Sequence, residues 1–122
     1  MASELRVNTL KDASGNNSVG MSYVANGSAK ALCLYDAPAQ TVDNSFNQSS
    51  LTDSGTGNFT TNFTNSFSAR GVVSGVTNRR SYFNLNDADA IATGTVNVTT
   101  DTSADSAVDK AETCIVTHGD LA

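Results

Sequence analysis

The chain has 122 residues and a formal net charge of -5, and its length is that of one domain. Ser, Thr, Asn and Gly are abundant, whereas the straight-chain helix formers Glu, Gln, Lys and Met are scarce, which argues against a helical bundle, a coiled coil or an α/β enzyme. The acidic balance argues against nucleic acid as the main partner, no apolar run is long enough for membrane insertion, and the N-terminus predicts no secretory signal.

Residues 1–28 differ from the rest of the chain in their turn formers, which recur at 12–17, at Gly20 and at 26–28. Leu5–Leu10 predicts a short strand, and Asp12–Asn17 is a dense cluster of turn-forming residues. A segment that can bury so little of itself is predicted to be an extended N-terminal arm, ordered only against another surface and used for docking or oligomerisation.

The first half of the remaining chain predicts strands separated by turns. Ala31–Tyr35 is a compact apolar run, and Thr41–Leu51 alternates loosely and predicts one strand. Asp53–Gly57 is the strongest turn signal, and it is followed by aromatic residues at spacing four: Phe59, Phe63 and Phe67. The intervening residues are Thr, Asn and Ser, which disfavour a helix, so the turn predicts a β-hairpin.

Four further strands are predicted in the second half, at Val72–Thr77, Ser81–Leu85, Thr93–Thr100 and Ala111–His118. The third of them alternates cleanly and places Val96 and Val98 on one face. The last has apolar residues on both faces, which predicts a central strand or one covered on both sides. The Ala-rich stretch Asp87–Ala92 is the one place where a short helix is expected.

About seven short strands with turns at regular intervals predict an all-β fold, a single antiparallel β-sandwich of jelly-roll-like type over residues 29–122. The chain has no Trp, five Phe and three Tyr, which is a thin supply for a core. Burial between copies compensates for a thin core, so we expect a homo-oligomer.

Candidate reactive residues are few. His118 is the single histidine, and without a nucleophile and an orienting carboxylate at suggestive spacing it is expected to be a surface or interface side chain. Cys33 and Cys114 lie in different predicted strands. They form a disulfide if those strands are adjacent and the Cα atoms are close, but two buried thiols are the favoured interpretation.

Two polar clusters have both a functional and an ordinary interpretation. The oxygen donors Asn84, Asn86, Asp87 and Asp89 are compatible with part of a calcium site, although such loops are usually ordinary turns. Arg79-Arg80 is compatible with a clamp for an anionic group, or with a hairpin tip that forms a salt bridge to Asp87 or Asp89. In both cases the ordinary interpretation is favoured, and we expect no catalytic residue, no cofactor and no metal.

Several stretches, spread over both ends and the middle of the chain, match a known pattern in their order and spacing: Leu5–Ser18, Gly27–Ala31, Asp43–Asn47, Ser49–Thr60, Asn62–Thr64, Ser106–Asp109 and Val116–Gly119. Together they resemble small tail-fibre-like or appendage proteins in the virions of marine tailed phages, of the type that infects cyanobacteria. That family places Trp and another aromatic residue where this chain has Leu32–Tyr35. The resemblance implies a β-sandwich-like fold and a structural role. It implies no binding residues for this chain.

The resemblance implies a non-enzymatic bacteriophage virion structural protein, a component of the tail fibre or an appendage, assembled in the cytoplasm of the host bacterium. Its expected partners are its own copies, as a trimer, and other phage virion proteins. A host surface glycan is a further expected partner, contacted through Tyr23, Tyr35 and Tyr82. One alternative is a capsid head decoration, or cement, protein. A second alternative is a carbohydrate-binding, adhesin-like module.

Overall fold

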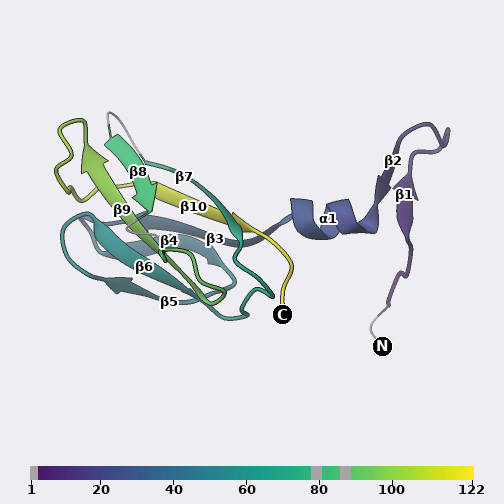
Figure 1. Cartoon of the computed structure of the whole chain (residues 1–122), viewed down its shortest axis with the longest axis horizontal. Helices are drawn as coiled ribbons and strands as arrows, with labels where there is room; N and C mark the ends of the chain where they lie inside the picture. Colours follow the sequence, from purple (N-terminus) through teal and green to yellow (C-terminus); the bar gives the residue numbers. More distant parts are fainter. Residues whose placement is uncertain (1–2, 78–80, 86–88) are drawn as a thin grey trace.

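The computed structural model describes residues 3–77, 81–85 and 89–122. A β-sandwich occupies most of the chain, and a smaller N-terminal segment projects from one end of it (Figure 1). The sandwich strands are β3 (Ala29–Asp36), β4 (Thr41–Phe46), β5 (Gln48–Asp53), β6 (Asn58–Phe63), β7 (Val72–Val76), β8 (Ser81–Leu85), β9 (Thr95–Thr102) and β10 (Thr113–His118). The predicted all-β antiparallel sandwich is confirmed.

Two four-stranded antiparallel sheets form the sandwich, in the orders β4-β3-β10-β7 and β5-β6-β9-β8. Strands β7 to β10 wind as a Greek key, because β10 pairs with β7, β8 pairs with β9, and the chain changes sheet between β7 and β8. Greek-key winding over two sheets of four strands is shared with jelly rolls. Strand β10 lies between β3 and β7, which confirms the central position expected from its two apolar faces.

The described sandwich has eight strands, one more than predicted, because the single strand expected over Thr41–Leu51 is two strands in different sheets. The chain changes sheet at Asn47, which has a positive φ of 53°. The Asn47 side chain holds this corner by accepting a hydrogen bond from the Asn65 backbone N–H (2.8 Å) and donating one to the Asn65 carbonyl (3.0 Å). Asn tolerates this left-handed conformation, and loose alternation alone does not reveal such a break.

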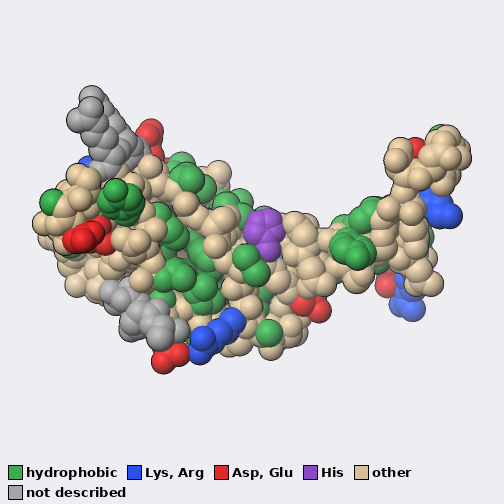
Figure 2. All heavy atoms as spheres, turned by 45° about the horizontal axis from the view of Figure 1, so that its top comes forward, with side chains coloured by type: hydrophobic (Ala, Val, Ile, Leu, Met, Phe, Trp, Pro, Cys, Tyr) green, Lys and Arg blue, Asp and Glu red, His purple; other side chains and the backbone are tan. Residues whose placement is uncertain are grey.

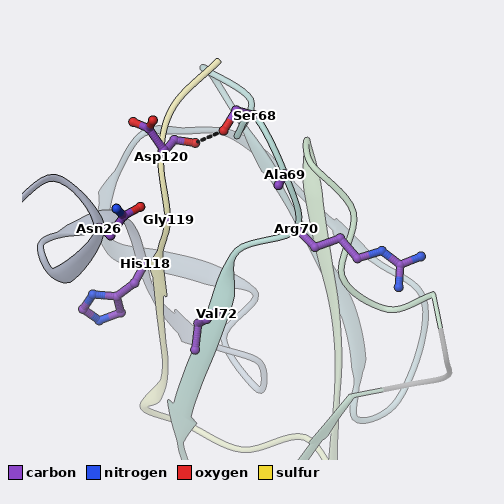
Figure 3. Close-up of a pocket in the computed structure, with 8 residues that line it drawn as sticks. All are labelled: Asn26, Ser68, Ala69, Arg70, Val72, His118, Gly119 and Asp120. Carbon is purple, nitrogen blue, oxygen red and sulfur yellow. Dashed lines mark hydrogen bonds between the residues drawn. The ribbon is translucent and has the colours of Figure 1, made fainter. Parts of the chain in front are cut away.

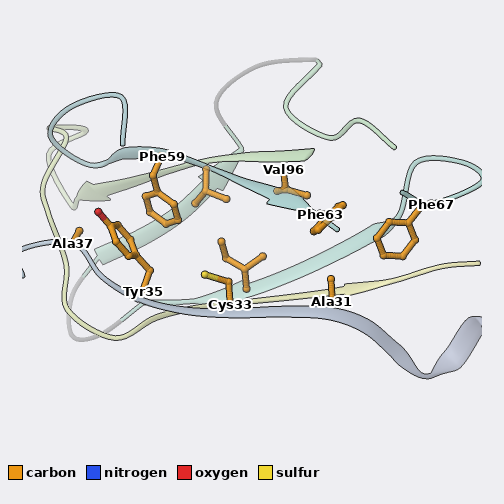
Figure 4. Close-up of a cluster of buried hydrophobic side chains, with 10 residues drawn as sticks. Ala31, Cys33, Tyr35, Ala37, Phe59, Phe63, Phe67 and Val96 are labelled. Atoms are coloured by element: carbon orange, nitrogen blue, oxygen red, sulfur yellow. The ribbon is translucent and has the colours of Figure 1, made fainter. Parts of the chain in front are cut away.

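The core lies between the two sheets and is lined by alternate residues of β3, β6, β9 and β10 (Figure 4). Val96 and Val98 are fully buried, as their alternation predicts. Phe59 and Phe63 share the inner face of β6. Phe67 lies beyond the end of that strand, is buried, and forms an isolated β-bridge with Leu121. The ring of Phe59 packs against Tyr35 with centroids 4.8 Å apart.

The short helix expected at Asp87–Ala92 is not formed by its described part. Residues 89 and 90 form a turn and a bend, and Ile91 forms an isolated bridge with Val96. Ala90 is buried, and its carbonyl accepts a hydrogen bond from Asn97 (2.7 Å). Tertiary contacts with β9 therefore override the local helix preference of alanine.

Cys33 and Cys114 are free thiols, which is the favoured sequence interpretation, but only Cys33 is buried. Their strands β3 and β10 are adjacent, yet the register pairs Cys33 with Ile115 and Cys114 with Leu34. Neighbouring residues of a strand point to opposite faces, so the offset of one residue directs Cys33 into the core and Cys114 outward. Burial raises the pKa of the Cys33 thiol to about 11.

We expect Cys33 to resist alkylation in the folded protein, because the thiolate is the reactive form and burial suppresses it. A Cys114→Ser variant isolates the Cys33 signal, and its labelling near pH 8 should be at least about 100-fold slower in the native state than in denaturant. Without reductant, the denatured parent chain should still show both thiols. Fast native labelling of Cys33, or loss of both thiols to a disulfide, would contradict the structure.

Candidate functional site

The N-terminal segment lies outside the sandwich and is folded locally (Figure 1). Strands β1 (Thr9–Lys11) and β2 (Ser18–Gly20) form an antiparallel hairpin, and helix α1 (Met21–Gly27) connects it to β3. We call residues 3–28 the arm. The strand expected over Leu5–Leu10 begins only at Thr9, and a hairpin and a helix are present where a fully extended chain was expected.

The turn of the arm hairpin is organised by Asp12. One carboxylate oxygen accepts hydrogen bonds from the Ser14 hydroxyl (2.9 Å) and the Asn16 N–H (3.0 Å), and the other accepts one from the Asn17 amide (2.7 Å). The bonds from Ser14 and Asn17 favour the ionised carboxylate and lower the pKa of Asp12. The cluster of turn formers in the sequence therefore becomes a self-contained loop that needs no partner.

The rest of the arm lacks such support. Leu5 is 80% exposed and Tyr23 is 76% exposed, and helix α1 buries none of its residues. Leu10 and Val19 are paired across the hairpin, so their exposed side chains lie together on one face. Isolated two-stranded hairpins are marginal in water and a helix of seven residues is too short to be stable alone. The hairpin and the helix therefore gain little stability from packing against the rest of the described chain.

The arm joins the sandwich at the end of β10, where His118 Nδ1 lies 3.0 Å from the carbonyl oxygen of Gly27. The Lys30 ammonium donates to the carbonyl oxygens of Ala25 and Ser28 at the C-terminal end of α1, where a cation is favourable. His118 thus holds the arm to the sheet, which agrees with the expected surface or interface role. Its Nδ1 acts as the donor in this contact.

A shallow cavity of about 270 Å³ lies beside this junction (Figure 3). Its lining includes Asn26 from the arm, Ser68 and Ala69 from the chain between β6 and β7, and Gly119, which directly follows β10. The Ser68 hydroxyl donates to the carbonyl oxygen of Asp120 (3.1 Å), and Figure 3 shows Arg70 and His118 pointing to opposite sides. These groups hold chain segments together and do not converge on a shared point.

The polar clusters singled out in the sequence are only partly described. Arg79, Arg80, Asn86 and Asp87 lie outside the described residues. The Asn84 amide donates to Asp101 (2.9 Å), and Asp89 forms an exposed salt bridge with Arg70 (2.9 Å). Among the described residues, no group of three His, Cys, Asp or Glu side chains is arranged to hold a metal ion.

The three tyrosines expected to contact a glycan do not form one surface. Tyr35 is only 2% exposed because it belongs to the core, where burial raises its pKa, so this part of the expectation is wrong. Tyr23 on α1 and Tyr82 on β8 are exposed, but they lie on the arm and the sandwich, respectively. The compact apolar run Ala31–Tyr35 indicated that Tyr35 is buried rather than exposed to a ligand.

A second surface was missed by the sequence analysis. The face of the sheet β4-β3-β10-β7 that points away from the core carries apolar side chains on all four strands, and we call it the outer face. The strand registers place its apolar members side by side: Leu32, Leu34, Phe46, Val72, Val76, Cys114 and Val116. Val72 is 71%, Val76 66% and Phe46 58% exposed.

Figure 2 shows hydrophobic side chains at the surface on both sides of His118, over the sandwich and over the arm. Phe46, Val72 and Val76 are the most exposed apolar side chains of the outer face, and its other apolar members are half-buried. The sequence signal was present, because both alternating sets of residues are apolar in Ala31–Tyr35 and partly apolar in Thr113–His118. Two apolar faces indicate cover on both sides, and the opposite sheet covers only one of them.

Comparisons with known protein families, with curated proteins and with solved structures found no match for this chain. Within the described residues, no helix has the length and apolar character needed to cross a membrane. The arm and the outer face are the two parts of the described chain with the most exposed apolar side chains.

Proposed function

We propose that this chain is a non-enzymatic structural subunit of a bacteriophage virion, a component of the tail fibre or an appendage, which works by assembly. The observation that carries the proposal is an arm outside the sandwich that does not bury its own apolar side chains. The resemblance of seven sequence stretches to marine phage appendage proteins supplies the biological setting. In this setting the arm contacts the particle or sister subunits, and the sandwich is the displayed domain.

The chemistry of the described residues supports a structural role. The Ser68 hydroxyl and His118 are each bonded to a backbone carbonyl, and neither is placed to activate the other. A polar exterior and a formal net charge of -5 keep a protein soluble at high copy number. Short strands at the end of an arm add main-chain hydrogen bonds to a neighbouring sheet with little apolar area.

Deletion of residues 1–28 tests the proposal in the phage that encodes the chain. The truncated protein should keep the β-type circular dichroism of the sandwich but be missing from purified particles, as measured by quantitative mass spectrometry. A matched control replaces the exposed Arg6–Glu4 ion pair by Arg6→Gln and Glu4→Gln, and this variant should be incorporated normally. Normal incorporation of the truncated chain would refute the docking role of the arm.

The same particles separate the tail proposal from the capsid alternative. A tail fibre or appendage component is expected in few copies per particle, whereas a capsid decoration protein is expected in very many. An adhesin-like module would require binding of the purified chain to host glycans, measured on a glycan array. Absence of the chain from purified particles would contradict both virion proposals.

A further inference from the structure

We infer that the outer face is the docking surface for the arm of a second copy of this chain, with the hairpin face of Leu10 and Val19 lying on the apolar side chains of the sheet. The inference rests on the proposed function in one respect, since it specifies how the arm assembles sister subunits. It concerns the purified chain alone, however, and is tested without the phage particle.

Each copy of the chain has one arm and one outer face, and both expose apolar side chains. Each copy has one arm whose short hairpin and short helix require cover, and one sheet face whose apolar residues Phe46, Val72 and Val76 are bare. Mutual cover between copies leaves neither surface exposed. The arm of the same chain does not provide this cover, because it projects away from its own sandwich (Figure 1).

The position of the arm suits an exchange between neighbours. Helix α1 leads directly into β3, a strand of the sheet that carries the outer face, and His118 of β10 fastens its last residue, Gly27. The arm therefore leaves the sandwich from an end of the same sheet that it would cover on the next copy. Repeating this contact around a symmetry axis closes a ring, and the trimer implied by the sequence resemblance is one such ring.

The charge distribution favours the arm over a second sandwich as the occupant. Residues 1–28 contain two basic and two acidic side chains, so the whole formal net charge of -5 lies on residues 29–122. Stacking two outer faces directly would bring together two negatively charged sandwiches. Placing a neutral arm on the outer face avoids that repulsion and buries the same apolar side chains.

Two full-length double variants test the inference. Val72→Asp with Val76→Asp places charges on the outer face, and Leu10→Ser with Val19→Ser removes the apolar face of the hairpin. We expect the parent chain to be a homo-oligomer by light scattering, and each variant to be a monomer, with association weakened by about 100-fold or more. Circular dichroism should stay of the β type, because the altered residues are exposed.

The decisive measurement mixes the two monomeric variants. One retains an intact arm and the other an intact outer face, so the mixture should form a one-to-one heterodimer, detected by light scattering or native mass spectrometry. A matched control, Tyr82→Ser with Leu85→Ser on exposed positions of β8, should keep the parent oligomer.

The opposing outcomes are separable. Face variants that are monomeric while arm variants remain oligomeric would show direct stacking of sandwiches and overturn the inference. A monomeric parent chain, or failure of the two variants to complement each other, would also overturn it. None of these results decides the proposed function, which is tested by the incorporation of the chain into particles.

Discussion

Replacing Phe59 with Ala should lower the free energy of unfolding by about 3–5 kcal/mol, the loss expected for truncating a large buried aromatic side chain. Phe59 is 1% exposed, it lies on the inner face of β6, and its ring packs against Tyr35 across the sandwich. The core contains few residues of this size, so little neighbouring volume is available to collapse into the cavity. The loss is a large part of the total stability of a small domain, which is typically about 5–15 kcal/mol.

Equilibrium unfolding in urea, followed by circular dichroism, measures this loss for the full chain. Tyr82→Ala is the matched control, because Tyr82 is a comparably large aromatic residue that is 54% exposed on β8. Its effect should stay within about 1 kcal/mol. Equal losses for the two variants would contradict the position of Phe59 in the core.

Replacing Gly57 with Ala should destabilise the fold by about 2–4 kcal/mol through backbone strain combined with a steric clash. Gly57 ends the turn between β5 and β6 with a positive φ of 66°. A Cβ atom at this position would lie 2.6 Å from both the Thr100 carbonyl oxygen and the Val108 nitrogen. Both contacts are to backbone atoms, so a change of side-chain rotamer cannot relieve the clash.

Hydrogen bonds hold the Gly57 backbone in this narrow place. Its N–H donates to the Asp109 carboxylate (2.7 Å), and its carbonyl accepts from the Thr100 N–H (2.8 Å). Gly55 in the same turn provides the control, because its φ of 113° is also unfavourable for Ala but no atom lies within 4 Å of its Cβ position. Gly55→Ala should therefore cost less, and thermal unfolding that ranks the two variants in the opposite order would contradict this packing.

The sequence predicted the layered fold because alternation over short strands is a local signal. Val96 and Val98 in β9, and the two apolar faces of β10, were interpreted correctly without any knowledge of their neighbours. The change of sheet at Asn47 was missed, since it depends on a side chain that binds residue 65, far away in the chain. Phe67 was assigned to the wrong element for the same reason, because its burial depends on the segment around Leu121.

The candidate site was less accessible from the sequence than the fold. The arm was predicted from its clusters of turn-forming residues, but its hairpin and helix were not, because each is too short to produce a periodic signal. Tyr35 was expected at the surface and lies in the core, whereas Val72 and Val76 in β7 form part of a bare apolar face. Which side of a strand is covered depends on the sheet opposite to it, and single-strand periodicity does not contain that information.

Turn spacing and alternation by themselves determined that this chain forms short antiparallel strands in two layers, because these properties arise between residues close in sequence. Only the tertiary structure decided the register that separates Cys33 from Cys114, the contact of His118 with Gly27, and the gathering of apolar side chains on the outer face. The physical reason is that register and facing are set by pairings between distant strands, in which a shift of one residue exchanges the buried and exposed sets of side chains.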